Sequence, residues 1–192
     1  MSFNANNLLI LVHPGSLFGS AETNLGKLEA RAAREEIWQT VLDHEGSLLV
    51  IDGMFSDEIP PAHDAGIEEA LGAARARGGL AIRAWGCDAG EAPPAGWLSR
   101  RRELDGKEPF VADGQREVIE RLARDMGADF VDLAIGVTGA WASYGESGCV
   151  NSVVDAVREC GGKATALDCA LYEPDAEDPA EDSIEETAPL GL

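Results

Sequence analysis

A single cysteine follows a glycine-rich turn in the segment SGCVNSVVDAVREC, at position 149. The apolar spacing after it predicts a helix whose first turn contains Cys149. Backbone N–H groups at a helix start favour a thiolate, and the amides of Gly148, Cys149 and Val150 could stabilise an oxyanion. Cys149 is therefore a candidate nucleophile. The alternative is that it packs as a small apolar side chain, as most free cysteines do.

Two charged residues occupy positions, at a strand end and ahead of a helix, where enzymes with a parallel sheet often carry catalytic side chains. Asp52 ends the apolar run SLLVID, and Lys107 lies in a polar segment ahead of a predicted helix. A carboxylate at a strand end could act as a general base, or it could cap the following loop through the backbone. A lysine could stabilise a thiolate or a carbonyl oxygen, or it could be an ordinary solvated side chain.

A second candidate site is the segment HPGSLFGSAET, residues 13–23, which follows the first apolar run. Small residues let backbone amides approach a phosphate, but a turn with a helix cap needs the same residue types. The segment has neither a Walker A motif nor GxGxxG spacing. Candidate ligand-binding residues are His13, Gly15, Ser16, Gly19 and Ser20, together with Trp85 and Trp141 for stacking on a flat substrate.

Strand and helix patterns alternate along most of the chain. Apolar runs within residues 7–13, 47–53, 80–86, 129–139 and 163–171 predict strands, and helical spacing within 25–44, 65–79, 114–128 and 147–162 predicts helices. This alternation predicts a Rossmann-like α/β three-layer sandwich, with a mainly parallel sheet of about five strands, in one domain over residues 1–172. Ligands of such sheets bind beyond the carboxyl ends of the strands.

The charge of the chain restricts its partners. A net charge of -20 repels nucleic-acid phosphates and anionic lipid, so we expect neither nucleic acid nor membrane as a partner. Residues 173–192 hold eight acidic residues and no basic one, which predicts a disordered acidic tail that could contact a basic protein. The first apolar run is too short for a signal peptide and no basic residue precedes it, which indicates a cytoplasmic protein.

The cysteines and the arginines add two further expectations. The four cysteines have no CxxC spacing, so we expect free thiols and neither a metal nor a cofactor. The segment SRRREL, residues 99–104, is the densest basic cluster. Its three consecutive arginines cannot share one helix face, so we expect a solvated surface.

The order of Asp52, Lys107 and Cys149 resembles that of the isochorismatase-type cysteine hydrolases, which include nicotinamidases. The similar segments are LLVIDGMFSDEIPP, GKEPFVADGQREVIERLARDMGADFVDLAIGVTG and SGCVNSVVDAVRECGGKATALDCAL, within residues 47–171. The resemblance implies a small-molecule substrate with an amide or similar C–N bond, attacked by Cys149 to give a thioester. It implies that Asp52 takes the thiol proton and that Lys107 orients Asp52. It also implies that the chain could form a homo-oligomer.

Two other functions stay open on the sequence alone. The first is a non-catalytic nucleotide- or phosphate-binding domain that uses the loop from His13 to Thr23. The second is a protein-interaction module that uses the acidic segment 173–192. The enzyme requires Asp52, Lys107 and Cys149 to converge, whereas the binding domain requires the amides of residues 15–23 to line an open pocket.

Overall fold

The computed structural model of the chain describes residues 7–87, 90–142 and 148–172. The strands are β1 (Asn7–Val12), β2 (Ser47–Asp52), β3 (Ala81–Gly86), β4 (Phe110–Ala112), β5 (Ala134–Ala142), β6 (Lys163–Ala166) and β7 (Leu171–Tyr172). The α-helices are α1 (Gly19–Leu25), α2 (Lys27–Asp43), α3 (Pro61–Ala76), α4 (Ala95–Asp105), α5 (Gln115–Met126), α6 (Ala128–Val131) and α7 (Cys149–Glu159). Two 3-10 turns, η1 (Pro14–Leu17) and η2 (Ser56–Glu58), follow β1 and β2.

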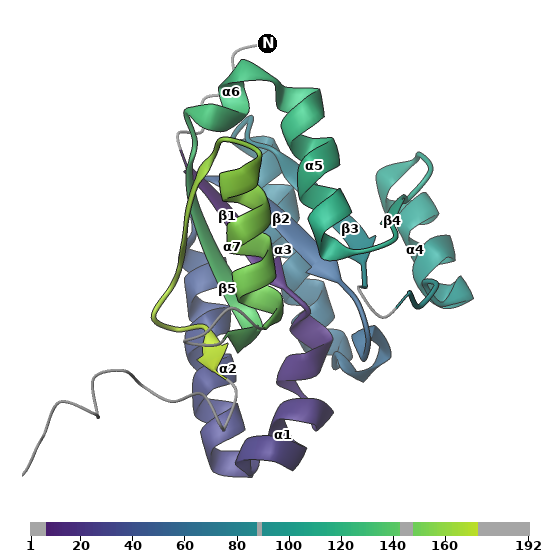
Figure 1. Cartoon of the computed structure of the whole chain (residues 1–192). Helices are drawn as coiled ribbons and strands as arrows, with labels where there is room; N and C mark the ends of the chain where they lie inside the picture. Colours follow the sequence, from purple (N-terminus) through teal and green to yellow (C-terminus); the bar gives the residue numbers. More distant parts are fainter. Residues whose placement is uncertain (1–6, 88–89, 143–147, 173–192) are drawn as a thin grey trace, which may run out of the picture.

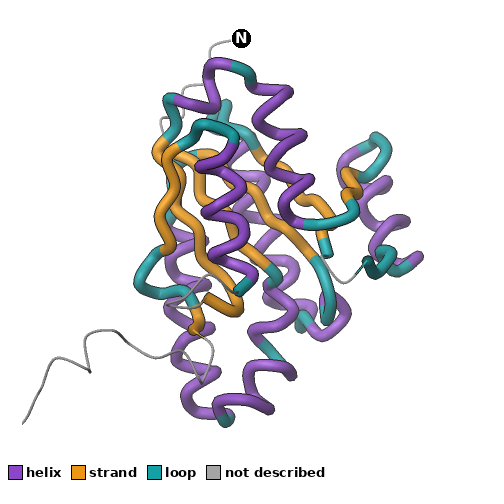
Figure 2. Tube along the Cα trace, viewed as in Figure 1, coloured by secondary structure: helices purple, strands orange, loops and turns teal. Residues whose placement is uncertain are grey.

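Six parallel strands form the sheet in the order β4-β3-β2-β1-β5-β6, and β7 pairs with the end of β5. Helices α5 and α7 cover one face, and α2 and α3 cover the other (Figure 1; Figure 2). The chain is therefore a Rossmann-like three-layer α/β sandwich, as the sequence predicts.

Alternate side chains of the central strands enter two separate apolar cores. On β1, Ile10 and Val12 pack beneath α5 and α7, whereas Leu9 and Leu11 pack beneath α2 and α3. Both faces of these strands are covered, which explains why each reads as a continuous apolar run. The same alternation decides which face each charged strand residue occupies.

Three elements differ from the predictions. The sheet has a sixth parallel strand, β4, whose three residues are too few to stand out from the polar sequence around them. The predicted loop after residue 16 contains the seven-residue helix α1. The basic segment at 99–104 lies in α4, and the predicted acidic tail, residues 173–192, lies outside the described residues.

Candidate functional site

The strand order identifies one place in the sheet where a ligand crevice is expected. From β1 the chain proceeds to β2, β3 and β4 on one side, and β5 and β6 lie on the other. Chain connections diverge between β1 and β5, and this is the topological switch point at which open α/β sheets bind ligands. The residues after β1 and after β5 therefore flank the candidate site.

His13 directly follows β1 at this edge. It is 7% exposed, and its Nε2 lies 3.0 Å from the carbonyl oxygen of Gly86, at the end of β3. A carbonyl oxygen only accepts, so Nε2 of His13 donates this hydrogen bond. A Cβ at Gly53 would lie 2.7 Å from the imidazole, so the ring packs directly over the end of β2.

Cys149 is the first residue of α7, beyond the end of β5. Gly148, with φ 111°, forms the N-cap without a side-chain hydrogen bond to the helix. The Cys149 side chain is half-buried against the core beneath α5 and α7, and its carbonyl oxygen accepts a hydrogen bond of 3.1 Å from Gln115 Nε2. The helix start is thus held against the N-terminus of α5.

A short chain of contacts joins the surroundings of His13 and Cys149. A Cβ at Gly86 would lie 3.1 Å from the backbone nitrogen and Cα of Gln115, so the end of β3 touches the start of α5. His13 binds the Gly86 carbonyl and Gln115 binds the Cys149 carbonyl. The end of β3, where His13 binds, is therefore linked through the N-terminus of α5 to the backbone at the start of α7.

Backbone strain gathers at the same edge. Among the described residues, three non-glycine residues have positive φ, namely His13 (47°), Phe55 (63°) and Trp141 (64°). They follow β1, follow β2 and lie near the end of β5, respectively. Such left-handed conformations cost free energy and tend to occur at functional sites. The strain thus coincides with the switch point and with the neighbouring strand end.

Asp52 takes part in a different set of contacts. Its carboxylate accepts hydrogen bonds from Arg83 Nε (2.6 Å), Arg83 Nη2 (3.2 Å) and Trp97 Nε1 (2.6 Å), and the side chain is fully buried. Alternation after Ile51 directs Asp52 to the face covered by α3. Burial alone would lower the pKa of Arg83, but the charges and hydrogen bonds of Asp52 and then Asp64 raise it above its usual value.

The buried network, as we call it, continues from Arg83 to α3 and α4. Arg83 Nη1 binds Asp64 (2.7 Å) and Glu68 (2.6 Å), which lie one turn apart on α3. Arg101 of α4 binds the same Glu68 oxygen at 2.7 Å. Arg100 of α4 also pairs with Asp64. Three arginines and three carboxylates are thus paired with one another beside β3. The network comprises Asp52, Asp64, Glu68, Arg83, Arg100 and Arg101, with Trp97 as an additional donor.

The structure does not bring Asp52, Lys107 and Cys149 together. Asp52 faces α3 within the buried network, whereas Cys149 packs on the opposite face of the sheet. Lys107 precedes β4, so it lies toward the amino-terminal side of the strands, where it lines a cavity with Asp125 and Asp129. Of the predicted catalytic residues, Cys149 is the one at the switch point.

The loop from His13 to Thr23 is folded tightly onto its surroundings. Gly15 and Ser16 are buried in η1, and a Cβ at Gly15 would overlap the backbone of Phe55. Gly19 and Ser20 begin α1, and the Glu58 carboxylate stands against Gly19. In the described part of the chain, the burial of this turn and the negative charge of Glu58 beside Gly19 are both unfavourable for a phosphate.

The two tryptophans predicted for stacking differ in their surroundings. Trp85 is 2% exposed, donates from Nε1 to the Glu91 carbonyl at 2.8 Å and meets Trp97 edge-on, with ring centroids 5.6 Å apart. It is therefore a packing residue. Trp141 is half-buried near the end of β5, beside the switch point.

Sequence reasoning missed the buried network. The prediction that the arginines at 100–102 form a solvated surface is wrong for Arg101, which is 1% exposed. One signal was available: Arg83 interrupts the apolar run LAIRAWG, and a buried arginine requires acidic partners. Asp64 and Glu68, four residues apart on a predicted helix, are such partners.

Within residues 7–87, 90–142 and 148–172, no group of three or more His, Cys, Asp or Glu side chains could hold a metal ion. In the same ranges, no helix combines the length and apolar character needed to cross a membrane.

Comparisons with known proteins give no family for this chain: no family model, no curated protein and no solved structure matches it.

Proposed function

We propose that this chain hydrolyses a small-molecule amide or similar C–N bond, with Cys149 as the nucleophile. The observation that carries the proposal is the position of Cys149 as the first residue of α7 at the switch point between β1 and β5. A thiol there meets the N–H groups of the first helical turn, which favour its anion. The net charge of -20 favours a small molecule over nucleic acid as the partner.

The proposed reaction is acyl transfer through a thioester. Cys149 Sγ bonds to the carbonyl carbon, and the amides at the start of α7 stabilise the oxyanion. The C–N bond then breaks, the amine leaves with a proton, and water hydrolyses the thioester to regenerate the thiol. His13, whose imidazole lies at the same edge of the sheet, is the proposed proton acceptor, because Asp52 is engaged with Arg83 and Trp97 on the other face.

Alkylation of the folded protein by iodoacetamide tests the nucleophile, with Cys160 as an internal control. Cys160 ends the same helix, and burial, followed by the charges of Glu120 and Glu159, raises the pKa of its thiol. We expect Cys149 to react at least about tenfold faster than Cys160 at pH 7, as measured by peptide mass spectrometry. Equal rates would remove the proposed nucleophile.

Ammonia release from nicotinamide, benzamide and aliphatic primary amides then tests the reaction. Cys149→Ser should abolish turnover, Cys160→Ser should leave it intact, and His13→Gln should lower kcat/KM by about 10²- to 10⁴-fold. Trapping the thioester by mass spectrometry after acid quench identifies the acylated residue. Turnover that persists in Cys149→Ser would contradict the proposal.

A further inference from the structure

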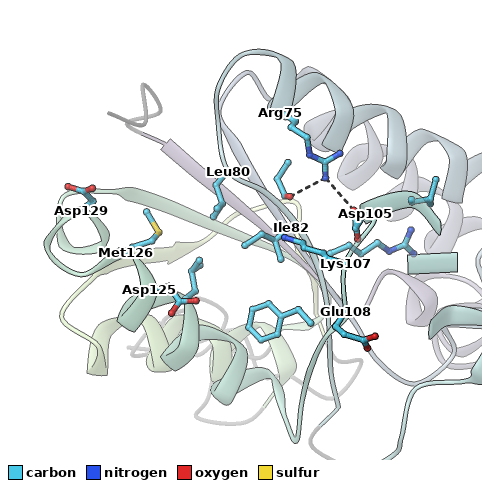
Figure 3. A pocket seen from close by; sticks show the side chains of 14 residues that line it. Arg75, Leu80, Ile82, Asp105, Lys107, Glu108, Asp125, Met126 and Asp129 are labelled. Atoms are coloured by element: carbon cyan, nitrogen blue, oxygen red, sulfur yellow. Dashed lines mark hydrogen bonds and ion pairs between the residues drawn. The ribbon is translucent and has the colours of Figure 1, made fainter. Parts of the chain in front are cut away.

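The cavity lined by Lys107, Asp125 and Asp129 lies away from Cys149, beside the first half of β3. Its volume is about 590 Å³, within the usual range for small-ligand sites. It opens where the sheet edge is incomplete, because β4 pairs only with Ala84, Trp85 and Gly86 of β3. The carbonyl of Ala81 faces this edge and accepts a long hydrogen bond of 3.4 Å from Arg75 Nη2 (Figure 3).

The floor of the cavity is apolar. Four half-buried side chains line it, one from just before β3 and the others from β3, β4 and α5, and each also packs against the core beneath α5 and α7. Their exposed surfaces could be covered by an apolar ligand, which would gain roughly 25 cal/mol for each Å² removed from water. These side chains are Leu80, Ile82, Phe110 and Met126.

The rim carries opposite charges on its two sides. Figure 3 shows Lys107 on the side of Asp105 and Glu108, with Asp125 and Asp129 across the cavity. Within the described residues, the exposed side chains of Lys107, Asp125 and Asp129 have no ion pair, whereas the other charged rim residues are paired. The paired residues are Asp105 with Arg75 at 3.5 Å, and Glu108 with Arg102 at 3.1 Å.

This distribution of charge selects one class of ligand. A purely anionic ligand would meet the carboxylates of Asp125 and Asp129, and a purely cationic one would meet Lys107. A ligand with a carboxylate at one end, an ammonium at the other and an apolar middle complements all three and the floor. A short apolar peptide with free termini has this form, and its backbone N–H groups could pair with the open edge of β3.

We propose that the cavity between β3, α4 and α5 binds a short apolar peptide with free termini. The peptide carboxylate pairs with Lys107, its ammonium pairs with Asp125 and Asp129, and its side chains cover the floor. This site is separate from Cys149 and does not depend on the proposed hydrolase function.

Calorimetric titration of the full chain with the dipeptide Leu-Leu tests the proposal. N-acetyl-Leu-Leu lacks the ammonium, Leu-Leu-amide lacks the carboxylate, and Ala-Ala lacks the apolar area. We expect saturable binding of Leu-Leu, and affinities about tenfold or more lower for each of the other three. Absence of Leu-Leu binding at millimolar concentration, or equal affinity for the blocked forms, would overturn the proposal.

Charge variants assign each end of the peptide to its side of the cavity. Lys107→Met should weaken Leu-Leu binding and remove the preference for Leu-Leu over Leu-Leu-amide. Asp125→Asn combined with Asp129→Asn should remove the preference for Leu-Leu over N-acetyl-Leu-Leu.

The matched control is Lys27→Met, at an exposed lysine on α2, and this variant should bind Leu-Leu as the unmodified chain does. All four positions are exposed, so the fold should be retained, and far-UV circular dichroism checks this. Preferences that survive both sets of substitutions would place the peptide elsewhere.

Discussion

Helices α7 and α4 are attached to the same sheet by opposite kinds of interaction. Helix α7 presents Val150, Val153 and Val157, all fully buried, to the apolar core. Helix α4 lies to one side of the molecule (Figure 1), and its buried residue is Arg101, which binds Glu68 of α3. Apolar packing is non-directional and depends on area, whereas buried ion pairs offset their desolvation only when every partner is present.

Because of this difference, we expect a substitution to lower the stability of the protein less in the apolar core beneath α7 than in the buried network beside α4. Trimming a valine or isoleucine beneath α7 removes a small area and leaves its neighbours in place. Removing one member of the buried network leaves a charge in the protein interior without its partner. The following changes test this contrast, in decreasing order of their expected effect on stability.

Substitution Arg83→Met should have the largest effect. Arg83 contacts Asp52, Asp64 and Glu68, so its loss leaves buried carboxylates uncompensated. We expect a loss of about 3–5 kcal/mol in the free energy of unfolding. Urea denaturation followed by circular dichroism measures it, and a loss below about 1 kcal/mol would contradict the importance of the network.

Substitution Trp97→Phe should have an intermediate effect. It keeps an aromatic ring beside Trp85 but removes the N–H that donates to Asp52 at 2.6 Å. A hydrogen bond to a charged group contributes about 1.5–3 kcal/mol, so the unfolding free energy should fall by that amount. Amide hydrogen exchange in the variant should be accelerated more in α4 than in α7. Uniform acceleration across both helices would contradict the local attachment of α4.

Substitution Ile119→Val should have a smaller effect. Ile119 of α5 is fully buried in the apolar core, and the change removes one methylene group. We expect a loss of about 0.5–1.5 kcal/mol in the unfolding free energy, measured in the same urea series. If this loss equalled that of Arg83→Met, the two regions would not differ in tolerance.

Lowering the pH should have the smallest effect on the free energy of unfolding. It acts through two histidines, His44 and His63, on the side of the sheet covered by α2 and α3. Burial lowers the pKa of His63, with a further lowering by Arg34. Burial also lowers the pKa of His44; the hydrogen bond to the Ser47 backbone opposes this lowering, and the charge of Arg77 adds to it. The unfolded chain therefore binds protons more readily than the folded chain does, and stability should fall as the pH drops below about 6.5.

A histidine variant separates this titration from that of the carboxylates. His63→Gln should flatten part of the fall in unfolding free energy between pH 7.5 and 5.5, measured by urea denaturation at both values. His63 packs edge-on against Phe18 and Trp38, where glutamine has no titrating group. An unchanged pH dependence would assign the fall to other groups.

The layered fold could be predicted because its strands are apolar on both faces. The segments NLLILV and SLLVID become β1 and β2 with almost every residue buried. By contrast, β4 is three residues long, and its pairing with β3 depends on tertiary context. Helix α4 has few apolar residues, and its partners on α3 are distant in sequence, so local pattern gave no reason to bury Arg101.

The candidate site could be predicted only in part. Strand ends point to His13 and to the region of Cys149, which the structure places at the carboxyl edge that parallel strands share. The predicted convergence of Asp52 with Cys149 takes no account of side-chain alternation along β2. Asp52 points to the same face as Val50, whereas Ile51 and Cys149 lie on the opposite face. The predicted role of Lys107 depends on its place ahead of a helix and on the family resemblance, neither of which shows that the lysine precedes a strand, β4, instead of following one.

The central position of β1 has a consequence for synthesis on the ribosome. β1 emerges first and can pair early with β2, which follows within the same nascent segment. Its other edge stays open until β5 emerges, because Asn7 pairs with Ala134 and Val12 with Gly139. This apolar strand is therefore exposed on one side until β5 has been made, and an unpaired edge can capture another chain. Release of the chain before β5 is made should favour aggregation, and the yield of native protein should depend on chaperones that shield that edge.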